Sequence, residues 1–255
     1  MTARILDINC DMGEGFGNWR MSDDAAVLPL ITTANLACGF HAGDPLIMME
    51  TVRAAREAGV AVGAHPGLPD LAGFGRRVMA LSAEELHAGF AYQIGALQAF
   101  LTIHGMRLNH VKPHGALFHV LRDPVMTEAA LDAITAVAPG AAIYWVGPLG
   151  REVFTTRALA RGMRVCAEAY PDLDYADDGS LLVERRKRPV EPALIASRIT
   201  EILTHGTLTN RNGVTLPMQV ESVCIHSDGP NVQEVLAAAR GAAAACGARL
   251  ACATA

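Results

Sequence analysis

The order of hydrophobic and polar positions predicts strands and helices that alternate along the whole chain. Seven apolar runs have the length of strands, and several of them are almost continuously apolar. Continuous apolar runs are typical of parallel strands that are covered on both faces. The predicted strands are residues 5–9, 31–38, 60–64, 108–111, 142–146, 163–167 and 222–225.

Helix signals lie between these runs. Asp44, Asp123 and Glu191 each precede a proline that suits a first helical turn, and Ser82 with Glu85 fits a capping box. Glycines that can close a helix follow at positions 59, 105, 140, 162, 206 and 247. The order of strand then helix is therefore repeated seven times, which predicts a parallel α/β fold.

Closure of the sheet is predicted by where the polar residues fall. Residues capable of chemistry follow every predicted strand except the fifth, whereas an open sheet would gather them near one switch point. We predict one domain over residues 1–255, a seven-stranded β/α barrel. A polar excursion at about residues 171–189 interrupts the alternation, either as a solvated loop or short hairpin, or as a lid or docking surface for another subunit.

Composition narrows the class of partner. The net charge of −5 argues against a nucleic-acid partner, which would need a basic face. Arg4 and Asp7 interrupt the N-terminus before a signal-peptide core can form, and no apolar run has the length of a membrane span. We expect a cytoplasmic protein with a small-molecule partner and no membrane contact. The sequence is compatible with either a monomer or a homo-oligomer.

Cysteine and lysine usage adds two expectations. The six cysteines include no C-x-x-C pair and are interpreted as small buried hydrophobes, with Cys10 and Cys38 kept as alternative catalytic thiols. Lys112 and Lys187 are the only lysines among 21 basic residues, so they alone offer a compact ammonium group.

The first candidate site block follows the first predicted strand. The period of two along a strand places Asp7, Asn9 and Asp11 on one side, and Glu14 follows. Paired acids suit a metal site or a general base, and the alternative is that Asp11 and Glu14 cap backbone amides in a turn.

A second block runs from Asn35 to Asp44 into a helix N-terminus. His41 lies among small residues there and could bind a carboxylate, a phosphate or a metal. Asp44 has two competing roles, as a helix cap and as a functional acid.

Further candidates end the third, fourth, sixth and seventh strands. His65 precedes a proline, and Lys112 shares a strand face with His114, a pair suited to stabilising phosphoryl or oxyanion charge while the imidazole moves a proton. His110 is expected to point away from this pair. Glu168, His226 and Asp228 add two acids and a base. The sequence contains neither the G-x-S-x-G elbow of serine hydrolases nor a Walker-type phosphate loop.

Four of these blocks resemble the LamB/YcsF family, the A subunit of ATP-dependent bacterial 5-oxoprolinase. They are the stretches 7–15 and 34–44, Gly63-Ala-His65-Pro66 with Phe74-Gly75-Arg76, and His110-Val-Lys112-Pro113-His114-Gly115. The resemblance covers nearly the whole chain. It implies a polysaccharide-deacetylase-like barrel that hydrolyses 5-oxo-L-proline to L-glutamate with ATP as co-substrate, together with B and C subunits.

The resemblance also implies roles for individual residues. Lys112 and His114 would stabilise phosphoryl charge, Asp11 or His41 would activate water or hold a divalent metal, and Glu168 would orient the substrate amide. Substrate contacts are expected from Asn9, Glu14, Asn35, His65, His226 and Asp228.

Two alternatives stay open. A metal-dependent deacylase or amidohydrolase acting on a related lactam or amide would ligate a metal through Asp11, His41 and His65. A non-catalytic subunit would use the same residues only to bind a ligand.

Overall fold

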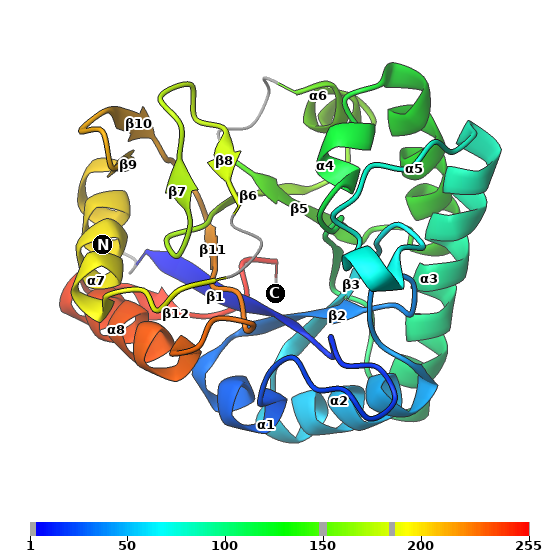
Figure 1. The fold of residues 1–255 in the computed structure, drawn as a ribbon, viewed down its shortest axis with the longest axis horizontal. Coiled ribbons are helices and arrows are strands. Elements are labelled where there is room, and N and C mark those ends of the chain that lie inside the picture. The colour runs from blue at the N-terminus through cyan, green and yellow to red at the C-terminus, as the bar shows by residue number, and fades with distance from the viewer. Residues whose placement is uncertain (1–3, 148–151, 184–186, 255) are drawn as a thin grey trace.

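Seven parallel strands close into a barrel in the computed structural model, which describes residues 4–147, 152–183 and 187–254. Each barrel strand pairs with the next one along the chain, and the last pairs with the first, which joins Asp7 to Ser222 and Asn9 to Cys224. The predicted closed barrel is confirmed, and helices surround it (Figure 1). The barrel strands are β1 (Ile5–Met12), β2 (Thr33–Ala37), β3 (Ala61–His65), β4 (His110–Val111), β5 (Ala142–Val146), β6 (Val165–Ala169) and β11 (Ser222–Cys224).

All seven predicted strands are present, and six of them have shifted ends. β1 continues to Met12 instead of ending at residue 9, so Asp11 lies inside the strand rather than in a turn after it. β4 is only His110–Val111, shorter than the predicted 108–111. Three short elements escaped the sequence analysis, namely the hairpin of β9 (Thr207–Thr209) with β10 (Thr215–Pro217), and β12 (Arg249–Leu250).

The helices begin where the capping signals predicted. The carboxylates of Asp44 and Asp123 accept backbone N–H groups of the first turns of their helices, and Ser82 with Glu85 forms the full capping box. Glu191 precedes its helix but makes no side-chain cap. The described helices are α1 (Asp24–Val27), η1 (Leu28–Leu30), α2 (Pro45–Ala58), η2 (Leu71–Gly73), α3 (Ala83–Ile103), α4 (Leu117–Val120), α5 (Pro124–Val137), α6 (Val153–Ala160), α7 (Pro192–His205) and α8 (Val232–Ala245).

The two faces of the barrel strands have opposite chemistry. Leu6, Ile8, Cys10 and Met12 of β1 join the hydrophobic core that lies between the strands and the helices. The alternate residues point inward, as the period of two requires, and are buried polar groups: Asp7, Asn9 and Asp11. The barrel interior is therefore polar, and the main hydrophobic layer surrounds it.

The C-terminal segment lies under the barrel, at the end where β1 begins. β12 pairs with Ile5 and Leu6, and the chain then turns inward (Figure 1). The Ala253 backbone N–H donates to Asp7 over 3.2 Å, and the Thr254 hydroxyl donates to Asn109 over 2.8 Å. Ala253 also packs on a small apolar cluster that includes Tyr144. This contact closes the barrel floor.

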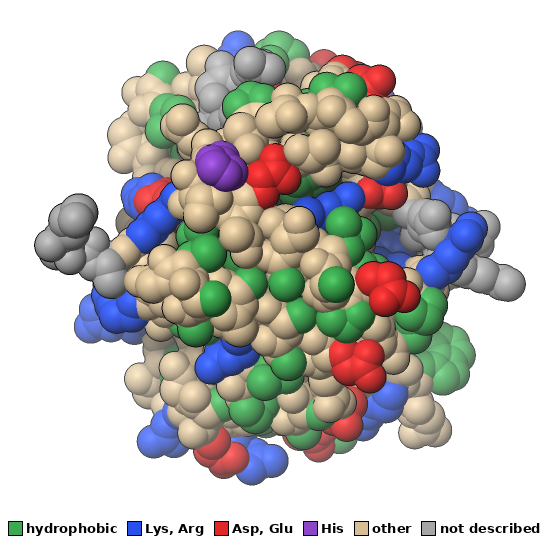
Figure 2. Space-filling view, turned by 90° about the vertical axis from the view of Figure 1, so that its left-hand side faces the viewer, with side chains coloured by type: hydrophobic (Ala, Val, Ile, Leu, Met, Phe, Trp, Pro, Cys, Tyr) green, Lys and Arg blue, Asp and Glu red, His purple; other side chains and the backbone are tan. Residues whose placement is uncertain are grey.

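Helices α7 and α8 pack against each other on one side of the barrel. Val235, Leu236 and Ala239 of α8 are buried, and the small alanines bring the two helices close together. On this face acidic and basic side chains are scattered rather than gathered into one patch (Figure 2). Within the described ranges, every helix is too short or too polar to cross a bilayer.

The polar excursion is in part a hairpin. Strands β7 (Asp174–Tyr175) and β8 (Leu181–Leu182) pair antiparallel after β6 (Figure 1). Residues 184–186 of the excursion lie outside the described residues.

We predict that Gly63→Ala lowers the free energy of unfolding by about 1–3 kcal/mol, measured by urea denaturation, because the barrel interior has no room for a methyl group. A Cβ at Gly63 would lie 2.2 Å from the His110 ring. That ring is held by a 2.7 Å hydrogen bond to Asn35 and by stacking on Tyr144.

The matched control is Gly95→Ala in α3, where an added Cβ meets nothing within 4 Å. We expect no loss there, and a gain of up to about 1 kcal/mol from helix propensity. Equal stability of the two variants would contradict the packing described for the interior.

Candidate active site

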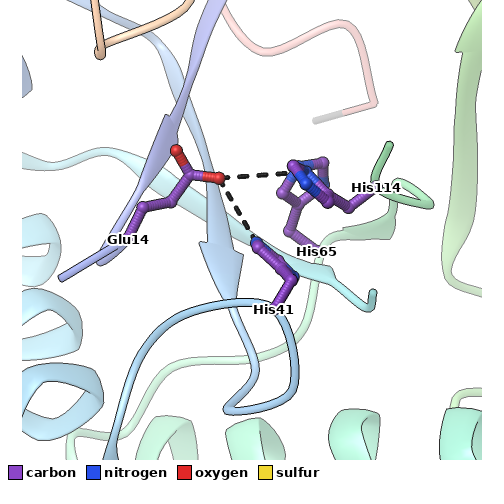
Figure 3. Close-up of side chains that lie close together, drawn as sticks. All are labelled: Glu14, His41, His65 and His114. Carbon is purple, nitrogen blue, oxygen red and sulfur yellow. Dashed lines mark hydrogen bonds and ion pairs between the residues drawn. The ribbon is translucent and has the colours of Figure 1, made fainter. Parts of the chain in front are cut away.

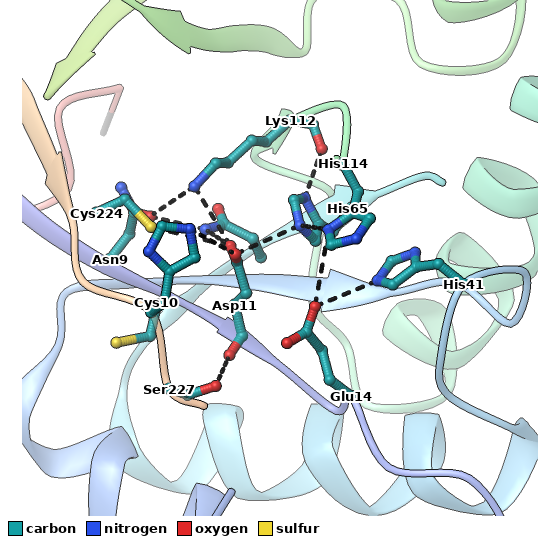
Figure 4. Close-up of polar contacts among 12 residues, drawn as sticks. Asn9, Cys10, Asp11, Glu14, His41, His65, Lys112, His114, Cys224 and Ser227 are labelled. Atoms are coloured by element: carbon teal, nitrogen blue, oxygen red, sulfur yellow. Dashed lines mark hydrogen bonds and ion pairs between the residues drawn. The ribbon is translucent and has the colours of Figure 1, made fainter. Parts of the chain in front are cut away.

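The residues predicted to act come together at the mouth and in the upper half of the barrel (Figure 4). All of them are buried except His226 and Asp228, which are partly exposed. The set comprises Asn9, Asp11 and Glu14 from β1 and its end, Asn35 from β2, His41 after β2, His65 from β3, Lys112 and His114 after β4, Glu168 from β6, and His226 and Asp228 after β11.

The ammonium group of Lys112 is the central cation. Its Nζ lies 2.9 Å from Glu168 Oε1 and 3.3 Å from Asp11 Oδ1, and the residue is 1% exposed. Burial lowers the pKa of Lys112, but Asp11 and other nearby groups more than offset this and hold the pKa well above its ordinary value. The Tyr170 ring faces the same ammonium group, with its centroid at 5.1 Å. Lys112 is therefore charged in this site.

Asp11 links this cation to the imidazoles. Its carboxylate accepts a 2.9 Å hydrogen bond from Asn35 and lies 3.5 Å from His65 Nε2 and 3.9 Å from His226 Nε2. Burial raises the pKa of Asp11, but its interactions with His65 and Lys112 outweigh burial and hold the pKa well below its usual range. The carboxylate is therefore ionised and able to accept a proton or to orient a water molecule.

A layer of amides lies below the charged groups. Asn9 Nδ2 donates to Glu168 over 2.5 Å and to the Ser222 hydroxyl over 2.7 Å, while its oxygen accepts from Asn35 over 2.7 Å. His110 Nε2 in turn donates to the Asn35 oxygen over 2.7 Å. The expectation that His110 points away was wrong, because a residue two positions before Lys112 along a strand shares its side.

Four buried side chains form a second cluster (Figure 3), which lies beside Lys112 (Figure 4). His41 Nε2 and His114 Nδ1 lie 3.3 Å and 3.8 Å from Glu14 Oε1, and His65 Nε2 lies 2.9 Å from His114 Nδ1. Burial, with the charges of Asp11 and Asp228, raises the pKa of Glu14 well above its ordinary value. Burial also lowers the pKa values of His41 and His114 well below theirs, so burial favours the neutral form of all three side chains.

This cluster differs from the metal ligands expected from the sequence. Glu14, His41, His65 and His114 each offer one ligand atom within 4.8 Å of the others. Asp11, which was expected with His41 and His65, instead groups with Cys224 and His226.

Ion pairs lie across the barrel mouth. Lys187 Nζ, at the end of the polar excursion, lies 2.7 Å from Asp228 and 3.6 Å from Asp172, and Arg76 lies 3.4 Å from Asp228. His226 Nδ1 lies 2.9 Å from Asp172, and although burial alone would raise the pKa of Asp172, His226 lowers it to about 2. A cavity of about 300 Å³ opens beside these residues. The segment thus reaches the mouth, where a lid would lie, and the lid role stays a prediction.

Two simpler interpretations hold for other candidates. The Asp44 carboxylate accepts backbone hydrogen bonds from Leu46, Ile47 and Gly17, so it is occupied as a helix cap. Burial raises the pKa of the Cys10 thiol, and raises that of Cys38 to about 12, which disfavours the reactive thiolate and supports packing.

Several residues of the site were not predicted. Tyr170, Ser222 and Cys224 point into the same network as Glu168 and His226. Each lies two positions from one of those two residues or from another in the set, so the period of two could have found them. The Asp172–Lys187 contact had no such signal, because it depends on the path of the excursion.

Comparison with known proteins agrees in fold and in sequence. A family model described as the LamB/YcsF family matches residues 6–255. A lactam utilization protein of Emericella nidulans is 45% identical over 234 residues, covering 90% of each chain. The 5-oxoprolinase A subunit of Mycolicibacterium paratuberculosis is 44% identical over 238 residues, which cover 92% of this chain and 93% of that protein.

A solved structure is also similar. The crystal structure of a lactam utilization protein from Thermus thermophilus superposes with a TM-score of 0.87 at 40% identity. The superposition covers 96% of this chain and 98% of that one, so the two chains share one fold over nearly their whole length.

We predict that Lys112→Met lowers the free energy of unfolding by about 3–5 kcal/mol, because it leaves the buried carboxylates of Asp11 and Glu168 without a cation. Adding Glu168→Gln to this variant should recover part of the loss, since one uncompensated acid is removed. Denaturant titration at neutral pH measures both.

The control is Arg164→Met, which breaks an ion pair with Glu221 whose side chains are 46% and 47% exposed. We expect a change below about 1 kcal/mol there. A Lys112→Met variant as stable as this control would show that the buried pair contributes nothing.

Proposed function

The chain belongs to the LamB/YcsF family, and from this we propose that it is the A subunit of a 5-oxoprolinase, hydrolysing 5-oxo-L-proline to L-glutamate at the expense of ATP together with B and C subunits. Relatives that are named as the A subunit of 5-oxoprolinase align with more than nine-tenths of this chain. The observation that carries the proposal is the buried ammonium of Lys112, held between Asp11 and Glu168 beside a pair of imidazoles.

The chemistry explains why ATP is required. Opening an unstrained five-membered lactam is unfavourable, so transfer of the γ-phosphoryl group to the amide oxygen, which releases ADP, activates the ring carbon. Water then adds to that carbon, the carbon–nitrogen bond breaks, and the ring nitrogen takes up a proton to become the amine. A second water hydrolyses the resulting acyl phosphate to glutamate and phosphate.

The catalytic groups have distinct tasks in this reaction. Lys112 and His114 stabilise the charge of the transferred phosphoryl group, as preorganised donors do in a site that excludes water. Asp11, which is ionised, or the neutral His41 accepts the proton of the attacking water. Glu168 orients the lactam N–H.

The remaining candidate residues lie at different depths between the barrel interior and its mouth. Asn9 and Asn35 already bond to the catalytic carboxylates, which suits them to hold Glu168 and Asp11 in position. Glu14 and His65 lie within the upper wall of the site. His226 and Asp228 lie at the mouth beside the 300 Å³ cavity and two cations, Lys187 and Arg76, which suit the carboxylate of 5-oxoproline.

A second candidate function is a metal-dependent deacylase or amidohydrolase acting on a related lactam or amide, which the grouped glutamate and histidines favour. It differs in needing no ATP. A non-catalytic ligand-binding subunit is the third, and it differs in tolerating loss of the catalytic groups.

The test is release of ADP and glutamate from 5-oxoproline and related lactams by the purified chain with and without B and C subunits. We expect turnover only with ATP and all three subunits. In the reconstituted complex, His114→Gln should lower kcat by about 100-fold or more, and the Lys112→Ala/His114→Ala double variant should be inactive.

Circular dichroism first establishes that each variant is folded, and Arg164→Met, far from the mouth, serves as the active control. Turnover without ATP that depends on added Zn²⁺ would support the deacylase. Rates like the wild type in the folded double variant would end the catalytic assignment in favour of a subunit that only binds a ligand.

A further inference from the structure

In the cluster of Glu14, His41, His65 and His114, the hydrogen bonds of two imidazole rings leave two ring nitrogens facing each other, and a cation between them would stabilise this arrangement. His65 Nδ1 lies 2.7 Å from the backbone carbonyl oxygen of Lys112, and His114 Nε2 lies 2.8 Å from that of Phe74. A carbonyl oxygen can only accept a hydrogen bond, so each of these ring nitrogens carries a proton.

The other nitrogen of each ring is then a lone-pair acceptor when the imidazole is neutral. These two nitrogens, His65 Nε2 and His114 Nδ1, face each other at 2.9 Å. Two lone pairs repel at this distance, so a proton or a metal ion must lie between or beside them.

A metal ion satisfies more of the site than a proton does. A proton on His65 Nε2 would bond to His114 Nδ1 and lie near Asp11 Oδ2, which is 3.5 Å away, but it would not engage the rest of the cluster. The Glu14 carboxyl and His41 Nε2 lie beside the same pair, 3.3 Å from each other, and would have no part in that bond.

The spacing of the four atoms matches a metal centre. Two ligand atoms bound at 2.0–2.1 Å to one tetrahedral zinc ion are about 3.3 Å apart. Here the separations include 2.9 Å between His65 and His114, 3.3 Å between His41 and Glu14, and 3.8 Å between His114 and Glu14. The values fall on both sides of the expected one.

The surroundings hold two of these histidines as metal ligands are usually held. A ligating histidine commonly donates its second N–H to a carbonyl oxygen, which fixes its orientation, and both His65 and His114 do so. Phe74, which supplies one carbonyl, is the sole non-glycine residue of positive φ in the described chain, at 54°. Such a conformation is strained for a residue with a side chain and is typical of functional sites.

The backbone also packs closely on the cluster. A Cβ at Gly75 would lie 2.7 Å from the Cβ of His41 and 2.8 Å from Cδ2 of His114. The imidazoles are therefore held rigidly before any ion binds.

We propose that Glu14, His41, His65 and His114 bind one divalent transition-metal ion, with His65 Nε2 and His114 Nδ1 as two of its ligands. Imidazole and carboxylate donors in this number suit zinc and its first-row neighbours. The site goes beyond the proposed function, because its occupancy is measured on the isolated chain without ATP, lactam or partner subunits.

The test uses tag-free protein stripped with a chelator and titrated with Zn²⁺ by calorimetry and with Co²⁺ by visible absorption. We expect one ion per chain, the strong absorption of tetrahedral Co²⁺, and a higher Tm with Zn²⁺. His65→Asn and His114→Asn should each weaken Zn²⁺ binding by about 100-fold or more. Removing a residue that only orients a metal ligand weakens metal binding by about 10–100-fold, so a direct ligand should reach or exceed the upper end of that range.

Two further variants guard the interpretation. Glu14→Gln keeps the size and shape of its side chain, so it should fold and yet bind Zn²⁺ at least about tenfold more weakly. His87→Asn, on α3 and bonded to the Ala129 carbonyl, is the control that should bind like the wild type.

The opposite result is equally definite. If Zn²⁺ and Co²⁺ bind the wild type no better than they bind Glu14→Gln or the histidine variants, the metal site is excluded. Nitrogen NMR that shows a proton shared between His65 and His114 in metal-saturated buffer would exclude it as well.

Discussion

The polar interior of this barrel depends on the ammonium group of one lysine. Asp11 and Glu168 are both buried among strands, and two carboxylates in such a place would be costly without a cation. Lys112 contacts both. The amides of Asn9 and Asn35 donate further hydrogen bonds to these carboxylates, so the charge is neutralised within a connected network of buried groups.

Lys112 also joins the two halves of the site. Its side chain contacts the carboxylates. Its backbone carbonyl accepts a hydrogen bond from His65 Nδ1 and thereby sets the orientation of that ring. His65 then faces both Asp11 and His114. A displacement of the strand end at Lys112 would therefore move acids and imidazoles together, which explains why one short stretch after β4 carries so much of the chemistry.

The sequence predicted the barrel well because its signals are local. Continuous apolar runs and capped helix starts are physical properties of short segments, and they located all seven barrel strands. Alternation along β1 placed Asp7, Asn9 and Asp11 on one side, although the same rule was misapplied to His110. The hairpin of β9 and β10 escaped because three-residue strands leave almost no pattern. The proton positions of His65 and His114 were out of reach, since backbone carbonyls that meet them carry no signature in the sequence.

The way the barrel closes has a consequence for how the protein is made. The hydrogen bond from Asn9 to Ser222 joins positions separated by 213 residues, so during synthesis β1 lacks one neighbour until β11 has been made. Until then its row of aspartates and asparagine, along with the unpaired edge beside it, faces solvent or a chaperone. Assembly of the candidate site therefore waits for β11 and carries the entropic cost of closing a long stretch of chain. Nascent chains that stall before β11 would carry nearly every candidate residue and still have no closed barrel around them.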